Sequence, residues 1–160
     1  MKVKDLCQIN PRPKHKYSDW INYIDTSSVN DGGLLDVVML NGDFPSRAQR
    51  ELLPNDILIS SVRPNLKHNY FVTIDKPRLI GSTGFIQIRA DSSRIVPKYL
   101  FYYLSSQPRV DMYTAIANLG QTAFPSFNKD VIEELVVPNI SIAEQRHIVD
   151  AMPIPLRESS

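Results

Sequence analysis

The spacing of hydrophobic positions predicts strands in the first half of the chain. Trp20–Ile24 is rich in aromatic and β-branched residues, which favour extended structure. A second possible strand, Leu34–Leu40, follows the turn-forming residues Asn30–Gly33. Ile57–Val62 gives the clearest prediction, because its continuous apolar start indicates a strand buried on both faces.

The pattern then changes from strands to helices. Tyr70–Ile74 and Gly84–Arg89 alternate between apolar and polar residues, as half-buried strands do. Pro97–Leu104 predicts a helix, since proline is well tolerated in a first turn, and Val110–Ala117 predicts another. Strands come first and helices later, which indicates an α+β fold with a twisted, mixed β-sheet and flanking helices.

Three further stretches carry weaker patterns. Met1–Ile9 has apolar residues spaced for one side of a helical turn. Asn10–Lys16 contains two prolines, which fix their own dihedrals and donate no amide, so it is predicted to be a basic loop. Asn41–Pro54 is expected to be another loop.

The C-terminal third predicts a closing unit followed by a helix. Lys129–Leu135 is expected to be a short helix, and Leu135–Val137 a buried strand that Pro138 ends. Ser141 and Glu144 form the pattern of a capping box, in which the Ser141 oxygen accepts the Glu144 amide and the Glu144 carboxylate reaches back.

The helix that begins at Ser141 is predicted to be short. Pro153 and Pro155 would break it after about three turns. We therefore expect a domain over residues 1–140, a short helix over 141–152 and a disordered tail over 153–160. An apolar stripe on this helix predicts either docking on another chain, including self-association, or completion of the domain's own core. The residues expected at the docking surface and its rim are Ile148, Val149, Met152, Gln145 and Arg146.

Length and composition are those of one ordinary globular domain. The chain has 160 residues and a formal net charge of +1, so a nucleic-acid surface would have to be a local patch. A lone cysteine excludes an internal disulfide and fits a reducing compartment. No leader and no long apolar run is present, so we expect a bacterial or archaeal cytoplasmic protein without a membrane segment.

Catalytic motifs are missing from the sequence. There is no phosphate-binding glycine loop, no dinucleotide fingerprint and no nucleophile elbow, and Gly81–Gly84 is better explained as a tight turn. His15, His68 and His147 are isolated, and nothing marks Cys7 as reactive. We therefore expect no metal, no cofactor and no enzymatic activity.

Charge is distributed unevenly along the chain. Residues 44–78 hold six positive and three negative side chains, a local charge of +3, whereas residues 128–150 hold two and five, a local charge of −3. Donor side chains in loops beside buried strands suit contacts to phosphates and base edges, although a solvated loop rim would have the same composition. The candidate DNA-binding residues are Lys14, Lys16, Arg47, Arg50, Arg63, Asn65, Lys67, His68 and Asn69.

Several motifs, in order, resemble the target recognition domain of the specificity (S) subunit of type I restriction-modification enzymes. The resemblance covers about residues 3–150. No single motif decides it, and the order of the motifs carries the argument. The matching stretches are Ser46–Arg50, Asp56–Asn65, Ser82–Ile86, Pro97–Leu104, Gly120–Phe127, Val137–Pro138 and Glu144–Val149.

The resemblance implies a DNA-binding, non-catalytic protein. In that family a subunit carries two recognition domains, each of which recognises one half of a split target in double-stranded DNA. Two long antiparallel helices set their spacing and seat the DNA methyltransferase (modification) subunits, and methylation and cleavage belong to the modification and restriction subunits. This chain has one such domain and only the start of a spacer helix.

Two functions of different class therefore stay open. The first is a sequence-specific DNA-binding module of a type I restriction-modification complex. The second is a truncated specificity subunit that docks on modification subunits without useful DNA binding of its own. Salt-dependent binding of DNA by the chain would separate them.

Overall fold

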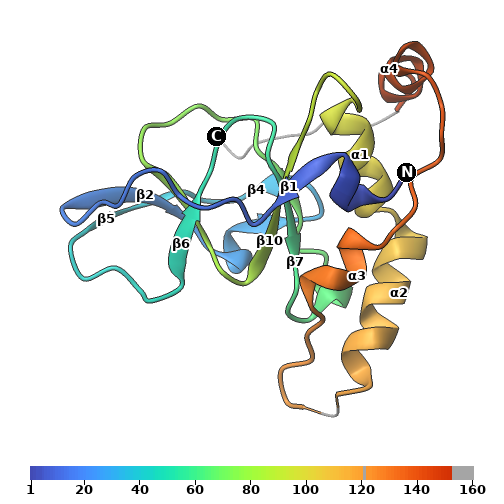
Figure 1. The fold of residues 1–160 in the computed structure, drawn as a ribbon. Helices are drawn as coiled ribbons and strands as arrows, with labels where there is room; N and C mark the ends of the chain where they lie inside the picture. Colours follow the sequence, from blue (N-terminus) through green and yellow to red (C-terminus); the bar gives the residue numbers. More distant parts are fainter. Residues whose placement is uncertain (121, 153–160) are drawn as a thin grey trace.

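Two four-stranded sheets form the centre of the protein, whose computed structural model describes residues 1–120 and 122–152 (Figure 1). The first sheet is antiparallel throughout. In spatial order its strands are β1 (Cys7–Ile9), β10 (Phe85–Ala90), β7 (Ile57–Ser60) and β8 (Tyr70–Phe71).

The second sheet is mixed, because β2 and β9 run parallel while the other pairs are antiparallel. A short hairpin of β3 (Val29–Asn30) and β4 (Gly33–Leu34) forms a separate two-stranded pair that packs against residues of both sheets. In spatial order the strands of the second sheet are β5 (Val38–Asn41), β2 (Trp20–Ile24), β9 (Leu79–Ser82) and β6 (Ala48–Glu51).

The helices gather on the side of the first sheet that faces away from the second (Figure 1). Among the described residues, three short 3₁₀ helices accompany four α-helices. The 3₁₀ helices are η1 (Val3–Asp5), η2 (Thr26–Ser28) and η3 (Pro64–Leu66). The α-helices are α1 (Pro97–Leu104), α2 (Gln107–Asn118), α3 (Lys129–Glu133) and α4 (Ile142–Asp150).

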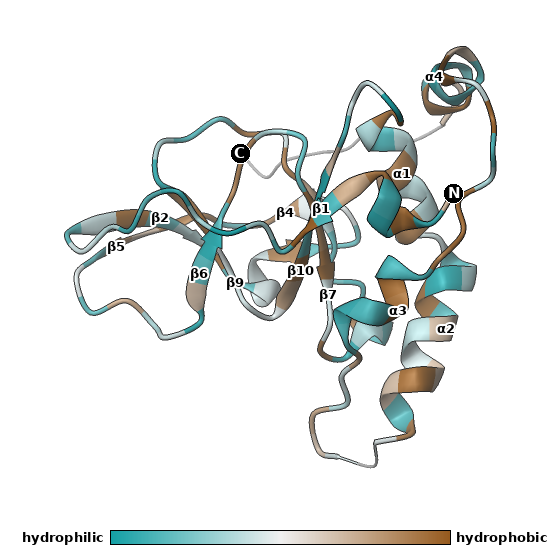
Figure 2. Cartoon of the chain, viewed as in Figure 1, coloured by the Kyte–Doolittle hydropathy of each residue, from teal (hydrophilic) through white to brown (hydrophobic). Residues whose placement is uncertain are grey.

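The main core lies between the first sheet and the helices, where hydrophobic residues follow β7 and β10 (Figure 2). Ile57 and Ile59 point to it from β7, while Leu58 joins Phe85 in a second cluster on the opposite face. All of β7 is buried. Its apolar side chains therefore pack into a core on each face of the sheet, as predicted for a strand buried on both faces.

The predicted α+β class is confirmed, but the single mixed sheet is replaced by two sheets. The chain leaves β9 at Ser82, turns at residues 83–84 and enters β10, which pairs with different strands. The sequence thus predicted the position of the glycine-rich turn. It did not predict that the chain passes from the second sheet to the first at this turn.

Other boundaries differ where tertiary pairing decides the structure. Strand β6 occupies part of the expected loop Asn41–Pro54, because it pairs with β9 despite its polar sequence. The predicted strand Leu135–Val137 is wrong, since Val136 is 62% exposed and makes only an isolated bridge to Lys2. Met1–Ile9 is η1 followed by a strand. The expected tail, 153–160, lies outside the described residues.

A buried carboxylate joins the two sheets. Asp56, 1% exposed, accepts hydrogen bonds from Arg89 Nε and Nη2 and from Gln87 Nε2, all at 2.9 Å. Both donors stand on β10, and Gln87 Nε2 also donates to the Glu51 carbonyl of β6 at 2.7 Å. The network therefore links β10 of one sheet to β6 of the other.

Replacing Asp56 with alanine should destabilise the protein strongly. The change leaves Arg89 without its ion pair and removes an acceptor from the buried Gln87 amide, a loss that costs about 3 kcal/mol or more in comparable networks. Urea unfolding would measure it. The control is Asp19→Ala, which removes the exposed ion pair to Arg78 and should move the midpoint much less. Equal shifts in the two variants would contradict the assigned role of Asp56.

Candidate nucleic-acid interface

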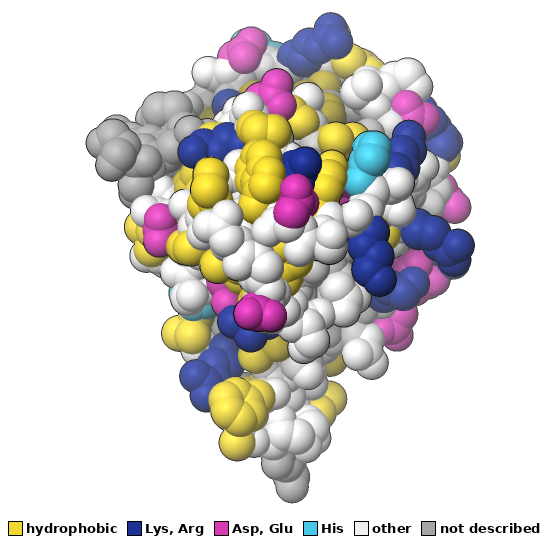
Figure 3. Space-filling view, turned by 90° about the vertical axis from the view of Figure 1, so that its left-hand side faces the viewer, with side chains coloured by type: hydrophobic (Ala, Val, Ile, Leu, Met, Phe, Trp, Pro, Cys, Tyr) yellow, Lys and Arg dark blue, Asp and Glu magenta, His cyan; other side chains and the backbone are white. Residues whose placement is uncertain are grey.

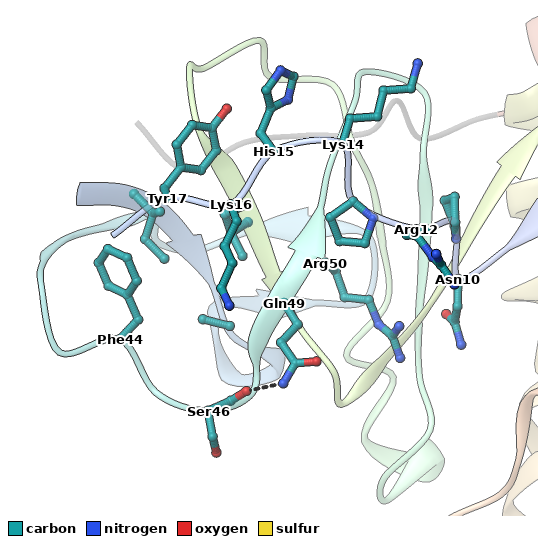
Figure 4. A pocket seen from close by; sticks show the side chains of 15 residues that line it. Asn10, Arg12, Lys14, His15, Lys16, Tyr17, Phe44, Ser46, Gln49 and Arg50 are labelled. Carbon is teal, nitrogen blue, oxygen red and sulfur yellow. Dashed lines mark hydrogen bonds between the residues drawn. The ribbon is translucent and has the colours of Figure 1, made fainter. Parts of the chain in front are cut away.

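A basic groove lies between the loop of residues 10–17 and strand β6. Its volume is about 830 Å³, and none of the fifteen lining residues is acidic. Lys16 extends from the loop toward Ser46 and Gln49, and Arg50 extends from β6 toward Asn10, whereas Lys14 and His15 point to the other side (Figure 4). The cationic side chains of the lining are Arg12, Lys14, Lys16 and Arg50.

The basic loop is held at both ends by hydrogen bonds. At its start, Asn10 Oδ1 accepts from Gln87 N at 2.9 Å, and Asn10 N donates to Gln87 O at 2.7 Å. Further along, the Glu51 carboxylate accepts from Lys14 N at 2.9 Å and lies 2.8 Å from His15 Nδ1. The loop therefore has a defined course across β6, although it contains no regular secondary structure.

The carboxylate of Glu51 is stabilised in its charged form. Partial burial alone would raise the pKa of Glu51, but the Lys14 N–H and the His15 ring outweigh burial and hold that pKa below its ordinary value. Folding thus favours ionised Glu51. Its contribution to stability is present above the ordinary pKa of a glutamate and is lost as the pH falls through the lowered value.

Stacked side chains support the far end of the loop. The Arg78 guanidinium lies 4.8 Å from the centre of the Tyr17 ring and 4.4 Å from that of Trp20, and Tyr17 also stacks on His15. Arg78 is further paired with Asp19 at 2.5 Å. The guanidinium of Arg78 is therefore already engaged by two aromatic rings and a carboxylate of the protein itself.

On the surface seen from the side of the second sheet, hydrophobic side chains gather next to Lys and Arg side chains (Figure 3).

The two candidate arginines of β6 and the loop before it have different surroundings. Arg47 donates to Asp25 Oδ2 from Nε at 3.1 Å and from Nη2 at 2.7 Å. The Arg50 side chain makes no hydrogen bond or ion pair among the described residues, and its Nε is buried without a partner. Burial lowers the pKa of Arg50. The charge of Arg47 is therefore balanced by the carboxylate of Asp25, whereas the charge of Arg50 has no paired carboxylate among the described residues.

A second group of candidates surrounds η3, away from the groove lining. Arg63 precedes η3 and Lys67 follows it, both in the left-handed region with φ of 46° and 56°. Such backbone costs about 1–3 kcal/mol per residue and persists only where the surroundings enforce it. Arg63 N donates to Pro125 O at 2.7 Å, and its guanidinium lies 5.0 Å from the centre of the exposed Phe124 ring.

The remaining candidates of this segment differ in accessibility. Asn65 is exposed on η3, and His68 is half-buried with Nδ1 2.7 Å from Val29 O. Asn69 is 4% exposed, and its Oδ1 accepts from Ser60 N at 3.1 Å. We therefore remove Asn69 from the candidate DNA contacts, because its side chain is buried and fixes the end of β7.

The predicted docking residues on α4 also fall into two sets. Gln145, expected at an exposed rim, is 4% exposed; Val96 N donates to its Oε1 at 2.8 Å, and Val149 packs on the main core. Ile148 and Met152 are 38% and 39% exposed. Arg146 is exposed as expected. One face of α4 completes the domain, and an adjacent face is open to solvent.

The helix starts where the sequence predicted. Ser141 Oγ accepts from Glu144 N at 3.1 Å, which is the first of the two bonds of the predicted capping box. Helix α4 ends at Asp150, two residues before the described part of the chain ends.

Sequence reasoning missed three groove residues. Asn10, Arg12 and Gln49 all line the groove, yet none was a candidate. Arg12 lies in the same basic loop as Lys14 and could have been included on that ground. Gln49 could not, because its place depends on an irregularity in a strand that the sequence does not predict.

Residues 1–154 match the family described as type I restriction modification DNA specificity domain. The chain belongs to this family. The resemblance stated from the motifs is thus confirmed, and it extends over nearly the whole sequence.

Relatives of this specificity domain are longer proteins. The HindI specificity subunit of Haemophilus influenzae is 27% identical over 129 residues, which are 80% of this chain and 28% of that protein. A type I R-M system structure, solved for complex assembly and conformational transition, matches with a TM-score of 0.78 and 27% identity. The HsdS subunit of Thermoanaerobacter tengcongensis matches with 0.77 and 26%. The two structures each match 94% of this chain, which is only 40% and 39% of their own chains.

Membership also bears on chemistry. Specificity subunits are non-catalytic, which confirms the expectation that this chain is no enzyme. In residues 1–120 and 122–152, no group of three His, Cys, Asp or Glu side chains is placed to hold a metal ion. Over the same residues, no helix has the length and apolar character needed to cross a membrane.

Replacing Glu51 with alanine should release the basic loop. The change removes the acceptor of the Lys14 amide and the partner of His15, so exchange of the Lys14 amide hydrogen should accelerate about tenfold or more. Amide hydrogen exchange by NMR measures it. The control is Glu133→Ala, which removes an exposed pair to Lys129 on α3 and should leave Lys14 unchanged. Unchanged protection of Lys14 in Glu51→Ala would show that Glu51 does not hold the loop.

Proposed function

We propose that the chain is a sequence-specific DNA-binding target recognition domain. It recognises one half of a bipartite target in double-stranded DNA, and methylation and cleavage are carried out by partner methyltransferase and restriction subunits. The observation that carries this proposal is the groove between residues 10–17 and β6, whose lining among the described residues has four cationic side chains and no acidic one. It occurs in a member of the specificity family.

The charge of the groove suits DNA better than the net charge of the chain suggests. The formal total is only +1, so attraction to phosphates must come from a local patch. Lys14, Lys16 and Arg12 are exposed on a loop that is anchored by backbone contacts. Side chains of this kind fix the register of a protein on the duplex through phosphate contacts.

A second set of contacts is proposed at η3, from Arg63, Asn65 and Lys67. All three carry donors at the surface, and the left-handed backbone at Arg63 and Lys67 gives this turn a fixed shape. Arg47 is proposed as a weaker contact, since its guanidinium is already paired with Asp25. His68 contributes less because one of its ring nitrogens contacts Val29 O.

Removing one groove cation should weaken binding and its dependence on salt. Lys16→Ala should lower affinity for duplex DNA and reduce the slope of log K against log salt by about 0.9, the value for one phosphate contact. Fluorescence anisotropy over a range of salt concentrations measures both. The control is Lys98→Ala on α1, which also removes one positive charge. Because Lys98 lies outside the groove lining, this change should leave the slope unchanged. Equal slopes for wild type and Lys16→Ala would exclude the groove as the phosphate-binding surface.

A docking function for α4 is favoured by its exposed apolar side chains. Ile148 is exposed on α4, and Met152 is exposed two residues after the end of that helix. A helix of nine residues is marginal in water, and here contacts with α1 and the main core stabilise it. We propose that Ile148 and Met152 contact another protein chain, either a modification subunit or a second copy of this chain.

Charged substitutions on α4 and just after its end test this surface. Ile148→Asp and Met152→Asp should abolish self-association or binding of a modification subunit and leave the melting temperature unchanged, because both side chains are already exposed. Ala143→Asp, an exposed change elsewhere on α4, is the control. Sedimentation and thermal unfolding give the two readouts. A fall in melting temperature for a chain that sediments as a monomer would show that the residues serve the core instead.

A further inference from the structure

Arg50 lies between two cavities, the basic groove and a second cavity whose lining also includes Asp130 and Glu133. It lines the groove of about 830 Å³ on one side and a second cavity of about 540 Å³ on the other, which extends to the start of α3. Asn10 also lines both cavities. Because Arg50 belongs to β6, it is part of the floor between the two, whereas Arg12, Lys14 and Lys16 come from the exposed loop.

A bulge in β6 sets the direction of the Arg50 side chain. Ala48 pairs with Ser82 and Arg50 with Gly81, so Gln49 is an additional residue in the strand. In a regular strand, consecutive side chains point to opposite faces. Here the bulge lets both Gln49 and Arg50 line the same groove, and bulges commonly redirect a side chain in this way.

The guanidinium of Arg50 is not satisfied within the described protein. Its Nε is buried without a hydrogen-bond partner, and partial burial lowers the pKa of Arg50. A cation that is partly removed from water and has no counter-charge lowers stability. Folding does not recover that cost within the described residues. Nη1 and Nη2 also make no hydrogen bond there, and unlike the buried Nε they are the donors left for an acceptor from another molecule.

Other arginines near the two sheets have partners of their own. Arg47 is paired with Asp25, Arg78 with Asp19 and Arg89 with Asp56. Arg12 forms no ion pair within residues 1–120 and 122–152, but it is exposed on the loop. Arg50 is thus distinguished by three properties together, namely a rigid strand position, partial burial and donors that are free among the described residues.

We propose that Arg50 recognises a guanine in the major groove and is a specificity-determining residue of this domain. The planar guanidinium can donate to guanine O6 and N7 at once in a fixed fork, a geometry that the flexible ammonium of a lysine does not hold. Exposed cations of the loop would meet phosphates at the rim, and Arg50 on the floor would meet a base edge. This inference rests on the proposed DNA-binding function.

Selection from duplexes of randomised sequence, using the full chain, tests the assignment. Wild type should select a motif containing a G·C pair. Arg50→Lys should lose preference at that pair by about 5- to 100-fold, the range for one bidentate contact, while the other positions and the salt slope are retained. Arg12→Lys, which keeps a phosphate contact, should select the same motif as wild type.

A second measurement uses the wild-type protein and modified DNA, so it does not depend on how the variants fold. Replacing the selected guanine with 7-deazaguanine removes the N7 acceptor, and binding by wild type should fall about fivefold or more.

The outcomes separate this inference from the proposed function. If Arg50→Lys selects the wild-type motif with equal strength, or if 7-deazaguanine leaves wild-type affinity unchanged at every selected guanine, Arg50 does not recognise guanine while DNA binding by the domain stands. An Arg50→Ala variant that loses affinity uniformly and reduces the salt slope by about one would assign Arg50 to a phosphate. A wild-type chain that selects no sequence would overturn both proposals.

Discussion

The arrangement of the two sheets depends on one buried carboxylate. Asp56 collects donors from Arg89 and Gln87 of β10, and Gln87 also donates to the Glu51 carbonyl of β6. These bonds compensate the desolvation of the carboxylate and join strands of different sheets at the same time. Because the turn after β9 sends the chain from one sheet into the other, this polar contact fixes how the sheets meet.

The candidate DNA-binding groove is built directly on that contact. Glu51 has its backbone in the Asp56 network and its carboxylate under the basic loop, where it accepts from Lys14 N. Arg50 is the preceding residue, so its position is fixed by the same strand. Phosphate contacts from the loop and a base contact from the strand would thus share one rigid support. Preorganisation of this kind lowers the entropy lost on binding.

Sequence patterns predicted much of the fold and less of the interface. Trp20–Ile24, the start of β7 and the first helix follow strong periodicities, and the structure contains them. Strand β6 was missed because its sequence is polar and only pairing with β9 makes it a strand. Asn69 was assigned to DNA because it lies in a donor-rich segment, but long-range packing buries it. Charge patterns locate candidate residues, whereas burial and pairing depend on contacts between distant segments.

The central claim is that residues 10–17 and β6 form the DNA-binding surface. The most direct test is a titration of the labelled full chain with duplex DNA carrying its selected sequence, followed by two-dimensional amide NMR. The largest shift changes should fall within residues 10–17 and 46–51 and should shrink as salt is raised. Shift changes confined to α4, or to the helical side of the first sheet, would contradict it.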